Sequence, residues 1–368
     1  MARLSIILIC GLSVMLFSPA GAQYTFDVEK SLACTPVKNQ QRTGTCWSFA
    51  TSSFIESEMM RRGLAEHDIS EMLIVRQVYF DKARNYLLRQ GKANFSEGSL
   101  SHDVIRTIDR FGFVPERVYP GREEMTQPHD HGELVAVLKG ALDALIARGK
   151  ISDNWPAVVN SILDIYLGTV PQDFLYDGQV HTAKSFAQSV GVQGGEYVSI
   201  TSFTHHPYYE QFILEIPDNY SNGRYYNVRL DELVQITDHA LRQGFTVAWD
   251  GDVSEKGFSQ KQSLAVLPAD PAREDLFLQP GAELMVDASA RQRAFESYST
   301  TDDHLMHITG IAHDQNGTRY YLVKNSWGAV GPSEGFLYMS EAYFRMKTVA
   351  IMVHRNAVPA SIAHKIDL

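Results

Sequence analysis

The sequence predicts an α+β fold in which the first half of the chain is mainly helical and the second half is rich in strands. Two observations support this prediction. Before residue 190, apolar residues recur at helical spacing in several segments. After residue 196, runs of β-branched and aromatic residues are separated by turn residues. Helices first and strands last are typical of an α+β arrangement in which helices and sheet pack against each other around a shared core.

The first 22 residues predict a cleaved signal peptide. Arg3 supplies positive charge, Leu4 to Phe17 form a nearly uninterrupted apolar run, and Ala20-Gly21-Ala22 fits the A-x-A cleavage pattern. The apolar run is shorter than the ~20 residues that a membrane-spanning helix needs. We therefore expect residues 23–368 to form the mature chain, in the periplasm or outside the cell, with no membrane attachment after cleavage.

Helices are predicted wherever a periodic apolar pattern is bounded by capping residues. The pattern begins at Cys46 and ends before Gly63, which is a plausible C-cap. Further helices are expected over residues 69–88, 102–111, 133–146, 155–167 and 231–243, and strands over residues 197–201, 245–249, 307–313, 318–325 and 335–339. An Asn316-Gly317 turn should join two of these strands.

Charge and histidine patterns exclude several function classes. The net charge of −10 argues against a nucleic-acid partner. His129-Asp130-His131 and His205-His206 are the only histidine clusters, and neither has further ligands at helix or hairpin spacing. We therefore expect solvated loop histidines, no metal site and no cofactor.

The segment from Gln40 to Ala50, with Cys46 at the start of a predicted helix, indicates nucleophilic chemistry. Free backbone N–H groups and the helix dipole favour a thiolate there, and the thiolate is the reactive form of cysteine. Far downstream lie His304 and the run Lys324-Asn325-Ser326-Trp327-Gly328. Cysteine, histidine and asparagine in that order, with glutamine ahead of the cysteine, are typical of cysteine peptidases acting on peptide substrates.

These motifs resemble the papain superfamily. Pro36 to Gln40 and Gly44 to Phe49 are similar to the segment around a papain-type nucleophile, and Asn325 to Gly328 to the segment of the orienting asparagine. His304-Leu305-Met306, followed by Thr309-Gly310, resembles the bleomycin hydrolase and bacterial aminopeptidase C branch. The resemblance covers roughly residues 35–120 and 195–356.

The resemblance implies specific roles for the residues that match. Cys46 would be the nucleophile, His304 the base and Asn325 the residue that orients the imidazole. Gln40 and the Cys46 N–H group would form the oxyanion hole. Substrate contacts are expected from Gly98, from Trp327, which would also shield the Asn325–His304 hydrogen bond, and from Ser99, which stands where the family has a second glycine.

His307 is the alternative base. It follows His304 by three residues, so in a strand the two side chains point to opposite faces. The family match favours His304.

Two further segments depart from the papain core. Residues 122–190 match it poorly and lengthen the spacing between Cys46 and His304 beyond the ~130–150 residues of the papain signature, so we interpret them as a mainly helical insertion. The resemblance to the bleomycin hydrolase branch implies that residues 357–368 form a C-terminal arm that crosses the cleft and places the Leu368 carboxylate near a substrate α-ammonium; the alternative is a frayed tail. The arm implies an aminopeptidase. A papain-like endopeptidase and a thiol acyltransferase or amidase remain alternatives, and homo-oligomerisation is left open.

Overall fold

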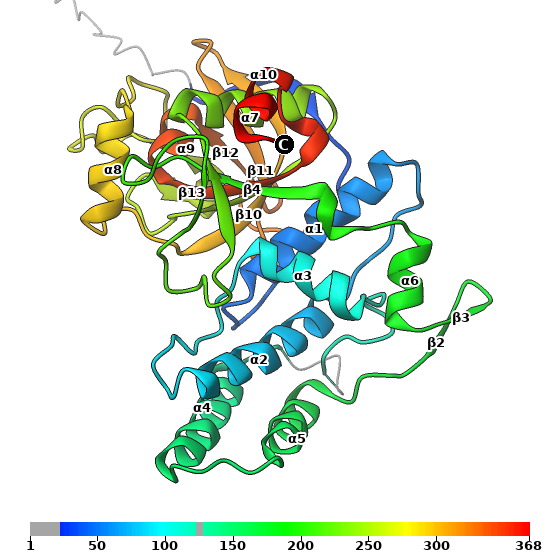
Figure 1. Cartoon of the computed structure of the whole chain (residues 1–368). Coiled ribbons are helices and arrows are strands. Elements are labelled where there is room, and N and C mark those ends of the chain that lie inside the picture. Colours follow the sequence, from blue (N-terminus) through cyan, green and yellow to red (C-terminus); the bar gives the residue numbers. More distant parts are fainter. Residues whose placement is uncertain (1–22, 123–127) are drawn as a thin grey trace, which may run out of the picture.

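The computed structural model describes residues 23–122 and 128–368 (Figure 1). The predicted signal peptide lies outside the described residues. Among the helices that are described, none is long and apolar enough to cross a membrane.

The described part of the chain has ten α-helices, of which six follow the predicted segments closely and four were not predicted. They are α1 (Cys46–Arg61), α2 (Glu71–Leu88), α3 (Ser101–Phe111), α4 (Gly132–Ala147), α5 (Trp155–Leu167), α6 (Ala183–Ser189), α7 (Leu230–Arg242), α8 (Ala288–Glu296), α9 (Glu341–Lys347) and α10 (Ala360–Ala363).

The strands are β1 (Phe26–Ser31), β2 (Phe174–Tyr176), β3 (Gln179–His181), β4 (Tyr197–Thr201), β5 (Gln211–Ile213), β6 (Arg224–Asn227), β7 (Val247–Gly251), β8 (Phe258–Ser259), β9 (Leu264–Ala265), β10 (His304–Asp314), β11 (Arg319–Lys324), β12 (Phe336–Ser340) and β13 (Thr348–His354).

One large mixed sheet forms the β-rich lobe. Its strand order is β5-β6-β4-β13-β7-β10-β11-β12-β9-β8, and β1 pairs antiparallel with the far end of β10, where Phe26 lies opposite Asp314. The long strand β10 is buried at nearly every position, so it is a central element of this lobe. From residue 23 onward the chain therefore starts in the β-rich lobe, leaves it to build the helices, and returns.

The helical lobe is built around α1, in which every residue from Cys46 to Met59 is buried. Helix α1 packs against β10 on one side and against α2 and α3 on the other. In Figure 1, α4 and α5 lie beside α2 at the end of the molecule away from the sheet. Residues 128–190 thus supply α4, α5, the hairpin β2–β3 and α6; their status as an insertion into a family core stays a prediction.

The predicted α+β, papain-like fold class is confirmed, with two differences in the strands. Strand β10 begins at His304 rather than His307, because it pairs with β7 from Gly251 onward. Strands β1, β2, β3, β5, β6, β8, β9 and β13 were not predicted. Strand β13 is buried throughout, which removes the polar alternation that would identify it.

The predicted C-terminal arm is wrong. Residues 357–368 fold back as α10 and a following turn, and Ile362 and Ile366 are buried in the apolar cluster that includes the core of α7. Lys365 donates to Glu232 at the start of α7 over 2.6 Å. Leu368 packs against the same cluster and does not line the cleft described below. The apolar residues of the segment prefer burial on α7 to an exposed course across a polar cleft.

Candidate active site

A cleft of about 600 Å³ is lined by three of the four residues that the sequence predicts to be catalytic, Gln40, Cys46 and His304. Its walls come from the segment before α1, the start of α1, the loop before α3, the β5–β6 loop, the start of β10 and the loop after β11. The lining residues are Gln40, Gly44, Cys46, Trp47, Asn94, Ser96, Glu97, Gly98, Ser99, Asp218, Asp302, Asp303, His304, Leu305 and Trp327.

Cys46 is the first residue of α1, with Thr45 as the N-cap. The first N–H groups of a helix have no intrahelical partner, so they are available to an anionic group near Cys46. The thiol lines the cleft, although the residue as a whole is 93% buried (7% exposed).

His304 is held by Asn325. The His304 ring donates from Nε2 to Asn325 Oδ1 over 2.7 Å, which leaves Nδ1 as the ring nitrogen available to accept a proton. The Asn325 amide is fixed in turn, because its Nδ2 donates to Gln260 Oε1 over 2.8 Å. The Trp327 ring lies 4.7 Å from the His304 ring, centroid to centroid, and covers one side of the imidazole.

Gln260 was not predicted from the sequence. It follows strand β8 in a short turn and carries no motif, yet its own amide Nε2 donates to the carbonyl oxygens of Val330 and Phe336. It is a positioning residue for Asn325. Only the three-dimensional contact between two loops identifies it.

The Gln40 side chain is fixed at both ends of its amide. Its Nε2 donates to the Thr43 carbonyl over 2.6 Å, and its Oε1 accepts from the Ser326 hydroxyl over 2.6 Å. An amide nitrogen carries two hydrogens, so one remains for an oxyanion in the cleft. Gln40 is thus pre-organised as a donor before substrate arrives.

Burial shifts the protonation of Cys46 and His304 in opposite directions. It raises the pKa of Cys46 to about 12 and lowers the pKa of His304 to about 4. Each group alone is therefore neutral near pH 7. Transfer of the thiol proton to the imidazole creates opposite charges whose attraction offsets the burial cost. The N-terminus of α1 alone does not offset the rise in the Cys46 pKa that burial causes. A reactive thiolate therefore needs the ion pair with His304.

The predicted substrate-contacting residues differ in what they present to the cleft. Gly98 lines it, and its carbonyl oxygen accepts from the buried Lys82 ammonium. Ser99 is buried, and its hydroxyl donates to Asp103 over 2.7 Å, so it is not free for substrate. Trp327 lines the cleft, and Leu368 lies elsewhere.

We expect Gln40→Ala to lower kcat about 10²- to 10³-fold with little change in KM, because one oxyanion donor is lost only in the transition state. Steady-state hydrolysis of an aminoacyl coumarylamide measures both constants. Gln172→Ala, at an exposed loop position, is the matched control. A higher KM with an unchanged kcat would contradict the assignment.

Four carboxylates that sequence analysis did not single out also line the cleft. They are Glu97, Asp218, Asp302 and Asp303. Glu97 is engaged, since its Oε2 accepts from the Gly44 N–H group over 2.6 Å. Among the lining residues, His304 is the only one that could carry a positive charge. The cleft is therefore acidic close to the catalytic pair.

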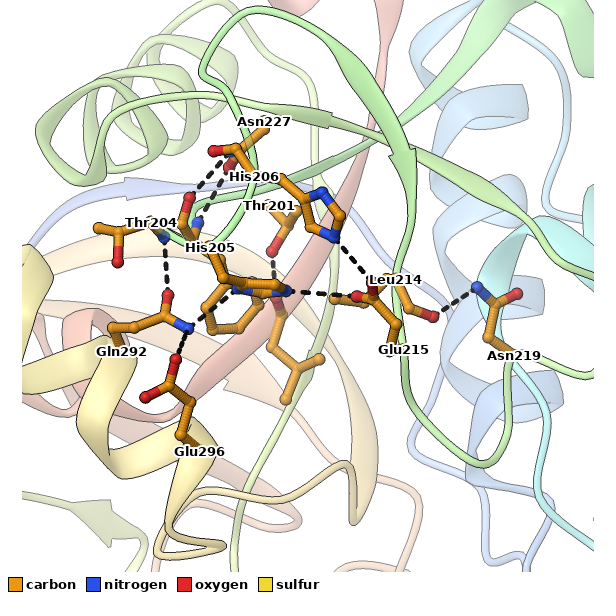
Figure 2. A network of polar contacts seen from close by, with 12 residues as sticks. Thr201, Thr204, His205, His206, Leu214, Glu215, Asn219, Asn227, Gln292 and Glu296 are labelled. Atoms are coloured by element: carbon orange, nitrogen blue, oxygen red, sulfur yellow. Dashed lines mark hydrogen bonds and ion pairs between the residues drawn. The ribbon is translucent and has the colours of Figure 1, made fainter.

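The His205-His206 pair lies on a loop where His205 and Glu215 are exposed, in agreement with the prediction, and it forms a hydrogen-bond network (Figure 2). His205 and His206 each contact a different oxygen of Glu215, at 3.2 and 2.7 Å, and these three residues offer ligand atoms within 4.8 Å of one another. Two histidines and a glutamate are a donor set that zinc uses.

The hydrogen bonds around His205 favour a metal-free arrangement. Gln292 donates from Nε2 to His205 Nδ1 and to Glu296, while its Oε1 accepts from the Thr204 N–H group (Figure 2). Nδ1 of His205 is thus an acceptor, so Nε2 carries the proton and donates to Glu215. A metal would have to displace that proton. The absence of a metal stays a prediction.

The other histidine pair is not solvated, which contradicts the prediction. His129 and His131 are both buried, and His131 Nδ1 lies 3.0 Å from the Tyr79 hydroxyl. Burial lowers the pKa of His131 to about 3. Both side chains therefore act as neutral packing groups between the segment 128–131 and α2.

Comparison with known proteins agrees with this geometry. The peptidase C1-like family matches residues 159–368, more than half of the chain, and the papain family cysteine protease model matches residues 22–127. The chain belongs to the peptidase C1-like family. It is a cysteine-type peptidase of the papain superfamily, in the branch of bleomycin hydrolase and aminopeptidase C.

The relatives span nearly the whole peptidase. Aminopeptidase C of Lactobacillus delbrueckii subsp. lactis is 23% identical over 93% of this chain and 84% of its own length. Bleomycin hydrolase of Rattus norvegicus is 23% identical over 93% and 85%. The crystal structure of PepW from Lactobacillus rhamnosis HN001 superposes with a TM-score of 0.70 at 19% identity, covering 93% of this chain and 84% of that one.

Proposed function

We propose that the peptidase is a cysteine aminopeptidase in which Cys46 is the nucleophile. The observation that carries the proposal is the cleft in which Cys46 meets His304, oriented by Asn325, and the fixed Gln40 amide. These are the parts that acyl transfer through a thioester requires.

The steps follow from this arrangement. The Cys46 thiol transfers its proton to His304 Nδ1 as sulfur attacks the scissile carbonyl carbon. The oxyanion accepts hydrogen bonds from Gln40 Nε2 and the Cys46 N–H group. The C–N bond breaks, the leaving amine takes the proton from His304, and an acyl-thioester remains. Water, deprotonated by His304, then releases the acid and restores the thiol.

The preference for a free N-terminus is supported by the relatives. The proteins named aminopeptidase C align over about nine tenths of this chain. The acidic lining of the cleft supports it too, because it suits a substrate ammonium better than a neutral blocked terminus.

One observation favours an endopeptidase instead. Residues 357–368 pack on α7, so they do not limit how far a substrate extends along the cleft. The two candidates differ in how they treat a blocked substrate.

The substrate pair alanyl coumarylamide and N-acetyl-alanyl coumarylamide separates them. An aminopeptidase should cleave the free-amine substrate at least about tenfold better in kcat/KM, the ratio for ~1.4 kcal/mol of differential binding. An enzyme that prefers the acetylated substrate and cuts longer blocked peptides internally would be the endopeptidase. Cleavage of neither, with acyl transfer to an added amine, would point to the acyltransferase.

The proposed location is the periplasm or the outside of the cell. It is supported by the Arg3, apolar and A-x-A pattern of the first 22 residues. N-terminal sequencing of the chain recovered from the cell exterior or periplasm tests it, with Gln23 expected as the first residue.

A further inference from the structure

Asp218 is placed in the cleft by the glycine it covers. A Cβ atom added at Gly98 would lie 1.8 Å from Asp218 Oδ2, so no larger residue fits at position 98 without moving the carboxylate. Asp218 Oδ1 accepts from the Asn94 amide at 2.9 Å and from the Ser96 hydroxyl at 3.2 Å. These two bonds hold one oxygen and leave Oδ2 as the oxygen that faces the glycine and the cleft.

Asp302 provides a second carboxylate, two residues before His304 in the chain. It lines the same cleft. Asp250 forms a side-chain hydrogen bond with it, and burial raises the pKa of Asp250 well above its usual value, so the protonated Asp250 carboxyl donates to Asp302 and leaves the negative charge on Asp302.

The loop that carries Asp218 is rigid. Asn219 donates to the carbonyl oxygens of Leu214 and Gly223 and accepts from the Gly223 N–H group, which closes the β5–β6 loop on itself. At the root of the loop, Glu215 is held by the two histidines shown in Figure 2. A carboxylate on a pinned loop keeps its position before substrate arrives, so little ordering entropy is lost on binding.

We propose that Asp218 and Asp302 bind the α-ammonium group of the substrate and so select peptides with a free N-terminus. In the acyl part of such a substrate, the ammonium nitrogen is two bonds from the scissile carbonyl carbon. It therefore enters the cleft with the carbonyl and needs a carboxylate there. The two aspartates take the part that the sequence had assigned to the Leu368 carboxylate. This inference rests on the proposed aminopeptidase activity.

The charges around Asp302 give the site a pH dependence. Burial raises the pKa of Asp302 to about 7; Asp218 and Asp303 act in the same direction, while Asp250 and Lys82 lower it. Above pH 7, Asp302 is ionised and attracts an ammonium. As the pH falls through about 7, it becomes neutral and the attraction weakens.

The decisive variants are Asp218→Asn and Asp302→Asn, which keep shape and remove charge. Each should lower kcat/KM for alanyl coumarylamide roughly 10- to 100-fold, the size of a lost charge-assisted hydrogen bond, and leave N-acetyl-alanyl coumarylamide within about twofold. Glu210→Gln, an exposed carboxylate before the same strand pair, should change neither. A thermal melt of each variant reports on folding separately.

The outcomes separate this inference from the function beneath it. If the wild-type enzyme shows no preference for the free-amine substrate, the proposed aminopeptidase activity itself is contradicted. A wild-type preference that survives in both variants overturns only the aspartate site. Loss confined to acetyl-lysyl-alanyl coumarylamide would mean that the aspartates bind a side-chain cation, which also overturns the α-ammonium assignment.

The pH dependence of kcat/KM distinguishes substrate binding by the two aspartates from a purely structural role, because a structural role would leave the pH profile unchanged. For the free-amine substrate, kcat/KM should fall below about pH 7, and Asp302→Asn should abolish that limb. For the acetylated substrate, activity should persist until His304 is protonated, near pH 4. Identical profiles for the two substrates in the wild type would contradict the proposal.

Discussion

Cys46→Ala is expected to lower amide hydrolysis at least about 10⁴-fold while the protein stays folded. The covalent route is lost entirely, and only the oxyanion donors and binding contacts remain, which in other acyl-transfer enzymes support a small residual rate. The fold should tolerate the change, because a small buried residue is replaced by another of similar volume. Coumarylamide turnover and a thermal melt measure the two effects.

Cys34→Ala is the matched control, since Cys34 is a second free cysteine that does not line the cleft. It should keep near-wild-type turnover. If Cys46→Ala retained more than a few per cent of wild-type kcat/KM, the peptidase chemistry would have to be reassigned to another residue.

His304→Ala and His307→Ala are expected to fail in different ways. Loss of His304 removes the proton acceptor and should lower kcat/KM about 10⁴-fold or more, with the melting temperature nearly unchanged. His307 lies on the opposite face of β10, fully buried, with Nδ1 2.9 Å from the Ser53 hydroxyl of α1. Its loss should cost about 2–4 kcal/mol of unfolding free energy, because a cavity forms between α1 and the sheet.

The comparison is made at a temperature where both variants are folded. Chemical denaturation gives the stability, and coumarylamide turnover gives the activity. A His307→Ala enzyme that is folded but as inactive as His304→Ala would exchange the roles of the two histidines. Burial lowers the pKa of His307 well below its usual value, so it stays neutral throughout such an assay.

Local sequence predicted most of the fold because its helices carry their own signals. The α3 and α7 segments have periodic apolar faces, and Gly112 marks the end of α3, so these signals do not depend on distant partners. The strands that escaped prediction depend on remote pairing instead. Strand β1 has a mostly exposed pattern and becomes a strand only because β10 offers it a partner.

The residues of the candidate site also fall into two groups, those that occur in sequence motifs and those that do not. Four residues occur in family motifs and could be predicted from the sequence: Cys46, His304, Asn325 and Gln40. The structure places Cys46, His304 and Gln40 on the wall of the cleft. Asn325 lies behind His304 and is hydrogen-bonded to it. Gln260, Asp218 and Asp302 belong to no motif and reach the site through loop geometry. The prediction of a C-terminal arm was wrong because it followed the family resemblance and gave too little weight to the apolar side chains of Ile362 and Ile366. The burial of these side chains on α7 decides the course of the segment.

The hydrogen bond between Ser326 and Gln40 has a consequence for how the enzyme is made. The two residues are 286 positions apart, so the oxyanion donor cannot be set until most of the chain has left the ribosome. At about 5–20 residues per second, that interval lasts roughly 15–60 s. A nascent chain carries Cys46 through this time without a finished cleft, and proteolytic activity appears only when synthesis is nearly complete.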